Sequence, residues 1–146
     1  MPAASMGRGL FQHNVITLFF AGALAVLLFH QGAIAILNVL GYAGQPFSYN
    51  KMPPWGVPQI WSFVFWGGVW GLLYGLAESK FPQGPLYFVA AFLFGAIFPV
   101  LVLWFVVFPL KHQPIAAGWN VTRMWAQVVI HGAWGLGIGI LLKWRS

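Results

Sequence analysis

The sequence predicts an all-α polytopic membrane protein with four transmembrane helices in one bundle. Of its 146 residues, 60% are hydrophobic and only 5% are charged, whereas soluble domains carry roughly 25% charged residues. The apolar residues fall into four runs, each close to the ~20 residues that cross a bilayer as a helix. Because the connections are short, we expect a single transmembrane domain over residues 1–146.

The first two helices are predicted over residues 14–40 and 59–79. The apolar run that begins at Val15 continues to Leu40, well beyond the roughly 7–15 residues of a signal-peptide core. We therefore expect a first transmembrane helix there. The loop that follows carries Pro53 and Pro54, which prevent a continuous helix. The second helix therefore starts after this loop, and the turn KFPQGP follows it.

The third and fourth helices are predicted over residues 86–108 and 121–143. The third contains Pro99, and a proline inside a helix removes one backbone hydrogen bond and usually kinks the helix. The fourth follows Asn120, a residue type that caps helix N-termini through its side-chain oxygen. We expect Asn120 to be such a cap.

The chain is basic, with a net charge of +6 and a single acid, Glu78. Its cations stand at segment ends, which is typical of lipid anchors and topology signals and argues against a nucleic-acid partner. There is no cysteine, which excludes disulfides and thiolate metal sites. With the N-terminus inside, Arg8, Lys80, Lys143 and Arg145 are inner and Lys51, Lys111 and Arg123 are outer. This bias favours a topology with both termini in the cytoplasm.

Aromatic and ionisable residues near segment ends are expected to lie at the membrane surface. Tyr74 and Tyr87 are predicted members of an interfacial aromatic belt. Glu78 and Lys80 flank the turn after the second helix and suggest an interfacial charge pair. His13 and His112 are expected to be solvated. Four tryptophans lie deeper and are predicted to pack between helices or to line a bound lipid or pigment: Trp66, Trp70, Trp104 and Trp134.

Two predicted helices carry stripes of glycine. Gly67, Gly71 and Gly75 repeat every four residues in the second helix. The fourth helix contains Gly132, Gly135 and Gly139. Small residues let transmembrane helices approach closely. The stripes either pair with each other inside one bundle, or at least one of them faces a second protein.

A set of polar residues interrupts the apolar helices. Such residues mark either function or essential hydrogen bonding. Because Arg123, Gln127 and His131 are spaced by four, they share one helix face. We expect a polar pocket that opens outward between the first and fourth helices, lined by His30, Gln31, Asn38, Arg123, Gln127 and His131.

Three interpretations of this polar set remain open. In the first, Gln127 and His131 form a structural hydrogen-bond cluster with the first helix. In the second, the pocket is a pathway for an ion or small molecule with His131 as a protonatable site, although transporters usually show broken helices or midplane carboxylates. In the third, His30 and His131 hold a haem. No metal cluster is predicted.

The predicted depths disfavour the haem. At about 1.5 Å per residue, His30 lies roughly 24 Å from the inner edge of its helix, and His131 about 15 Å from the inner edge of a ~30 Å core. Two axial ligands must lie at nearly one level, and the mismatch is about 9 Å. We therefore predict no cofactor.

Three segments carry a resemblance to a known family. They are AESKFPQGPLYF between the second and third helices, FVVFPL at the end of the third, and HGAWGLGIGILL in the fourth. In these segments the chain resembles four-helix bacterial inner-membrane proteins of the YagU type. The resemblance implies a four-helix inner-membrane fold, and it implies no defined activity and no site residues.

The function expected from these features is that of a non-catalytic membrane subunit. It would contact lipids and pack through its glycine faces against itself or a larger membrane assembly of respiratory or photosynthetic type. The chain shows no nucleophile–base pair, carboxylate pair or phosphate loop, so it is not expected to be an enzyme. The alternative is a small homo-oligomeric channel or carrier that uses the outward pocket.

Overall fold

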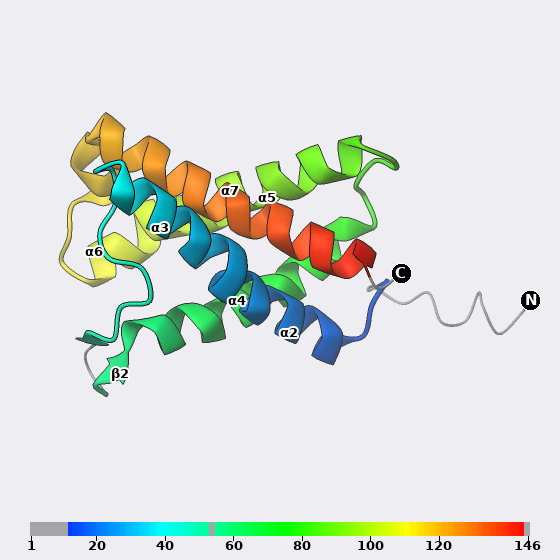
Figure 1. Ribbon diagram of the computed structural model, residues 1–146, viewed down its shortest axis with the longest axis horizontal. Helices are drawn as coiled ribbons and strands as arrows, with labels where there is room; N and C mark the ends of the chain where they lie inside the picture. The colour runs from blue at the N-terminus through cyan, green and yellow to red at the C-terminus, as the bar shows by residue number, and fades with distance from the viewer. Residues whose placement is uncertain (1–11, 53–54, 145–146) are drawn as a thin grey trace, which may run out of the picture.

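The chain forms a bundle of four membrane-length helices (Figure 1), seen in a computed structural model that describes residues 12–52 and 55–144. Four spans are long and apolar enough to cross a membrane: Val15–Val39, Gln59–Glu78, Leu86–Leu110 and Val121–Trp144. They confirm the predicted all-α four-helix class, and each boundary lies within two residues of the predicted one. Arg8, Pro53, Pro54 and Arg145 lie outside the described residues.

Two of the spans contain a π-helical turn. The first consists of α2 (Val15–Ala25), η1 (Val26–His30) and α3 (Gln31–Val39). The third consists of α5 (Leu86–Val102), η2 (Leu103–Val107) and α6 (Phe108–Leu110). Pro99 lies inside α5, and η2 begins four residues later. Single π-turns inside α-helices are frequent at functional sites, and η1 ends on His30.

The other two spans are uninterrupted helices, α4 (Gln59–Glu78) and α7 (Val121–Trp144). Asn120 caps α7 as predicted, because its Oδ1 accepts a hydrogen bond from the Arg123 backbone N–H at 3.1 Å. Asn14 caps α2 in the same way, through a 2.7 Å bond from the Thr17 N–H. Each cap satisfies a backbone donor that the helix itself leaves free.

Short structured loops cover the end of the bundle opposite the start of α2 and the end of α7. The strand β1 (Lys51–Met52) pairs antiparallel with β2 (Val57–Pro58) just before α4. The 3₁₀ segment η3 (Ile115–Trp119) connects α6 to α7. Within it, Ala116 and Ala117 have φ of 50° and 53°, a left-handed conformation that costs about 1–2 kcal/mol per non-glycine residue. Both alanines are buried, so their packing offsets the cost of this conformation and stabilises the turn.

The helices follow the spatial order α4, α2, α7, α5 (Figure 1). The closest pairs are α5 with α7 and α2 with α4, and α2 also packs on α7. Although α4 and α5 are consecutive, they meet mainly through large aromatic side chains, such as Tyr74 and Phe94 with ring centroids 5.3 Å apart. Helix α4 therefore lies at one edge of the bundle.

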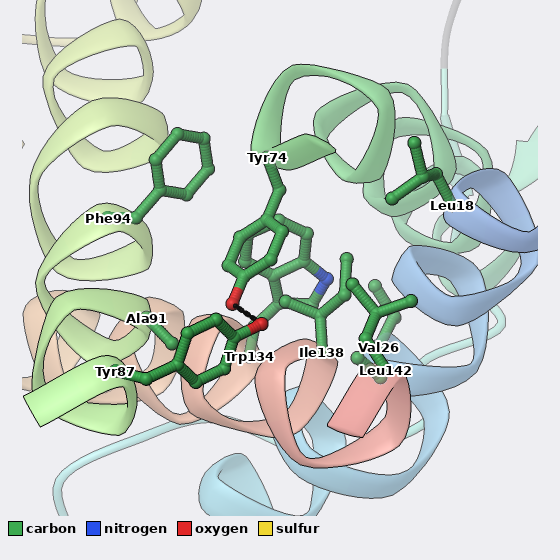
Figure 2. Close-up of a cluster of buried hydrophobic side chains, with 10 residues drawn as sticks. Leu18, Val26, Tyr74, Tyr87, Ala91, Phe94, Trp134, Ile138 and Leu142 are labelled. Carbon is green, nitrogen blue, oxygen red and sulfur yellow. Dashed lines mark hydrogen bonds between the residues drawn. The ribbon is translucent and has the colours of Figure 1, made fainter. Parts of the chain in front are cut away.

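The core lies where all four spans converge (Figure 2). Leu18 and Val26 reach it from the first span, Tyr74 from α4, and Phe94 from α5. Trp134 of α7 is 3% exposed, and its indole Nε1 donates to the backbone oxygen of Gly22 at 3.0 Å. This bond satisfies a buried polar group and ties α7 to α2.

The two glycine stripes do not pair with each other. In α4, a Cβ on Gly67 would clash with Val26 and the Gly22 backbone oxygen of the first span, and one on Gly71 would clash with the Leu18 backbone oxygen of α2. A Cβ on Gly135 of α7 would clash with Ala91 O and Gly95 in α5. The stripes lie apart because α2 stands between α4 and α7 in the bundle.

The remaining glycines of the stripes are also covered within the chain. A Cβ on Gly139 would press on Ala91 and on the Tyr74 hydroxyl, and one on Gly132 would meet the Phe92 ring. Gly75 is buried in α4. The expectation that one of these stripes faces a second protein is therefore wrong for these positions.

Candidate functional site

The structure brings four of the six predicted polar residues together. The imidazole rings of His30 and His131 pack edge to face, with centroids 5.1 Å apart. Gln31 Nε2 donates to His30 Nδ1 at 3.1 Å. His131 Nδ1 lies 2.8 Å from the backbone oxygen of Gln127. Because a carbonyl oxygen only accepts, His131 carries a proton on Nδ1, whereas His30 Nδ1 acts as an acceptor.

The cluster also joins other parts of the fold. Gln31 Oε1 accepts a 2.6 Å hydrogen bond from the Phe47 backbone N–H in the loop after α3. Gln127 Oε1 accepts a 2.7 Å bond from Trp104 Nε1 in η2. The cluster therefore connects the first, third and fourth spans and one loop. We call His30, Gln31, Gln127 and His131, with Trp104, the mid-membrane cluster.

Among these side chains, His30 and Gln31 are buried and Gln127 and His131 are half-buried, and the outward-opening pocket stays a prediction. His30 is 6% exposed and Gln31 is 1% exposed. The Phe63 ring of α4 lies 5.3 Å from the His30 ring, centroid to centroid. Each of the four side chains has at least one polar atom bonded within the cluster or to the backbone, as the structural hydrogen-bond interpretation describes.

Asn38 and Arg123 lie outside the mid-membrane cluster. Asn38 Nδ2 donates to the Ala43 backbone oxygen at 3.1 Å, which closes the end of the first span onto its own loop. Arg123 is exposed and borders a small hollow of about 180 Å³ with Phe108, Gln113, Pro114 and Ala117. Arg123 lies in the first turn of α7, directly after η3, whose Ala117 lines the same hollow.

The predicted depth mismatch between His30 and His131 is also wrong. Helix α7 has 24 residues and is about 36 Å long, which is longer than the ~30 Å hydrocarbon core from which the depth of His131 was predicted. Along the helix axis, His30 lies about 22 Å from Val15 at the start of α2, and His131 lies about 20 Å from Trp144 at the end of α7. The two rings therefore meet at one level.

A second polar cluster, which the sequence did not predict, lies where α2 begins and α7 ends, at the end of the bundle predicted to be the inner one. Tyr74 Oη donates to Tyr87 Oη at 2.8 Å (Figure 2), and Tyr87 Oη donates to Glu78 Oε2 at 2.5 Å. His13 Nε2 lies 3.3 Å from Glu78 Oε1. Lys143 Nζ stands 4.4 Å over the Tyr87 ring. We call Glu78, Tyr74, Tyr87 and His13 the inner-end cluster.

The inner-end cluster corrects three expectations. Glu78 is 2% exposed and contacts His13 instead of forming a surface pair with Lys80. His13 is packed against the bundle, with its side chain 19% exposed. Tyr74 and Tyr87 are 0% and 3% exposed, so neither belongs to an interfacial belt. The spacing of four between Tyr74 and Glu78 places both on one face, a signal that could have revealed the cluster.

The two clusters lie at different depths, separated by the apolar core around Trp134 and Ile138. Ionisable residues inside a membrane mark ion or proton pathways or essential hydrogen bonds. Here each cluster bonds elements that come from distant parts of the sequence. Among residues 12–52 and 55–144, no group of three or more His, Cys, Asp or Glu side chains is placed to hold a metal ion.

Comparisons of the chain with known protein families, with curated proteins and with solved structures found no match. The resemblance to proteins of the YagU type therefore stays a prediction.

Proposed function

We propose that the chain is a non-catalytic membrane subunit that binds a second membrane protein through the exposed face of α4. The observation that supports this proposal most strongly is the exposed side chain of Trp66. The glycine stripes are covered within the chain, so a partner has to use another surface. In the mid-membrane cluster His30 and Gln31 are buried, so a channel or carrier function would require these side chains to become accessible.

Helix α4 offers the surface because it packs mainly on α2. Its other side presents large apolar side chains: Trp61, Phe65, Trp66, Leu73 and Leu76, each at least 40% exposed. We call these residues the α4 face. Trp61, near the start of α4, suits the interface between lipid headgroups and the hydrocarbon core. Trp66 lies deeper.

Trp66 favours a protein over lipid tails as the neighbour of this face. It is 55% exposed and stands seven residues after the start of α4, about 10 Å into the helix. Trp104 and Trp134 each donate their indole N–H to an acceptor. Within the described part of the chain, Trp66 Nε1 has no such acceptor. Lipid tails offer none either, and an unpaired donor in hydrocarbon is costly.

The proposal predicts that Trp66 lies in a protein–protein contact. A photo-crosslinking residue at position 66 should form an adduct with a partner protein in native membranes. The same residue at Leu93, which is 47% exposed on α5, is the matched control and should not. Trp66→Phe keeps a ring but removes the N–H. It should weaken association about threefold, the equivalent of the ~0.6 kcal/mol average for hydrogen bonds between transmembrane helices.

Native mass spectrometry of mild-detergent extracts checks the assembly. Two differently tagged copies in one cell show whether the partner is a second copy of this chain. The proposal fails if the wild-type chain stays at its own mass of 16.2 kDa with lipids only, or if Trp66→Ala leaves the complex unchanged.

A further inference from the structure

A groove runs along the surface between α2 and α7 at the inner end of the bundle. It has a volume of about 490 Å³, and its walls are mostly apolar. Phe20, Ala21 and Leu24 of α2 form one side, and Leu141 and Leu142 of α7 form the other. His13, Thr17 and Trp144 border it as well. We infer that this groove binds one acyl chain of an anionic phospholipid.

The length of the groove matches one membrane leaflet. It extends along α2 from His13, just before the helix, to Leu24, a distance of about 16 Å. Half of a ~30 Å hydrocarbon core is about 15 Å. An acyl chain that enters beside His13 therefore reaches the end of the groove near the middle of the bilayer. A transmembrane helix of a partner would continue past this point.

The polar end of the groove favours a negative headgroup. The one acid of the sequence, Glu78, is buried and contacts His13. Lys143, in the last turn of α7, is exposed next to Trp144 of the groove, and its Nζ stands over the Tyr87 ring. The capped N-terminus of α2 lies at the same end, and it carries the positive end of the helix dipole. A phosphate with a net negative charge would therefore meet Lys143 and the positive end of the α2 dipole, while the carboxyl group of Glu78 at this end is buried.

The groove differs from the α4 face in its helices and in its ligand. A lipid site here does not depend on the proposed protein partner, so each is tested separately. The Trp66 experiments concern α4, whereas the lipid test concerns side chains of α2 and α7.

Native mass spectrometry of the full chain, reconstituted in vesicles with equal phosphatidylglycerol and phosphatidylcholine, tests the inference. The wild-type chain should retain phosphatidylglycerol preferentially. Leu24→Trp fills the groove and should abolish this retention. Leu93→Trp makes the same change at an exposed position on α5 and should leave it intact. Ala21→Leu also narrows the groove, but with a side chain smaller than tryptophan. It replaces Leu24→Trp in the test if that variant does not fold.

The headgroup is tested through Lys143. Lys143→Gln should lower the preference for phosphatidylglycerol about fivefold, which corresponds to about 1 kcal/mol for one Lys at an anionic surface. Lys143→Arg keeps the charge and should restore the preference. The inference is overturned if both lipids are retained equally, if folded Leu24→Trp and Ala21→Leu both retain the acidic lipid, or if a crosslinker at position 21 captures a protein helix in place of lipid.

Discussion

Tyr87 holds two other polar side chains in place inside the bundle. Its hydroxyl accepts from Tyr74 and donates to Glu78. All three residues are at most 3% exposed, so water cannot replace a lost partner. A buried polar group without its partner costs about 1–3 kcal/mol. The stability of the inner end therefore depends on this one hydroxyl group.

Tyr87→Phe should destabilise the protein by about 1–3 kcal/mol, because it leaves the Glu78 carboxyl group without its donor and Tyr74 without its acceptor. Thermal unfolding in one fixed detergent measures the change. Tyr49→Phe is the control, since Tyr49 is 67% exposed and should change stability little. Equal melting temperatures for Tyr87→Phe and the wild-type chain would show that the hydroxyl contributes nothing.

At the scale of residues, the sequence predicts which polar side chains are candidates for a buried cluster, but it does not predict which atoms they bond. Gln31, Gln127, His30 and His131 were recognised as candidates because polar residues are rare in such apolar helices. The hydrogen bonds that Gln31 accepts from Phe47 N and Gln127 accepts from Trp104 Nε1 could not be predicted. Those partners are 16 and 23 residues away along the chain, and only the rotation of each helix decides which side chains meet.

At the scale of elements, glycines set the distance between two pairs of helices. In α5 and α7 the contact centres on Gly95 and Gly135, where each helix reaches the backbone of the other. In α2 and α4 it centres on Gly22 and Gly67. Without hydrophobic attraction between helices in lipid, close packing of this kind provides much of the stabilisation.

Gly135→Ala should therefore force α5 and α7 apart. Its Cβ would clash with Ala91 O and approach Gly95, and overpacking of this kind costs about 1–3 kcal/mol. The control is Gly32→Ala in α3, where a Cβ meets nothing within 4 Å. Because alanine has the higher helix propensity, the control should be neutral or stabilise by up to about 1 kcal/mol. Thermal unfolding of both variants distinguishes a packing role from a general effect of glycine, and equal changes would contradict the packing role.

At the scale of the whole molecule, four spans place the start of α2 and the end of α7 at the same end (Figure 1). The α4–α5 turn shares that end, and the loops containing β1, β2 and η3 lie at the other. The Lys and Arg bias favours the cytoplasm for the first end. We propose that both termini lie there, in a bacterial inner membrane.

Cysteine labelling tests this topology directly, because the chain has no cysteine of its own. In intact cells, a membrane-impermeant thiol reagent should label His112→Cys, in the η3 loop, and should not label Lys80→Cys, in the α4–α5 turn. Both positions are exposed, so both should be labelled once the membrane is permeabilised. The reverse pattern in intact cells would place the termini outside.

The four spans and the cap at Asn120 could be predicted from the sequence, because hydropathy, span length and capping are properties of neighbouring residues. The contacts between those spans depend on the tertiary structure. It turned Glu78 inward towards Tyr87 and His13, brought His30 level with His131, and paired each glycine stripe with a different helix. These outcomes depend on the order, rotation and length of helices packed across the bundle, which no local pattern in the sequence specifies.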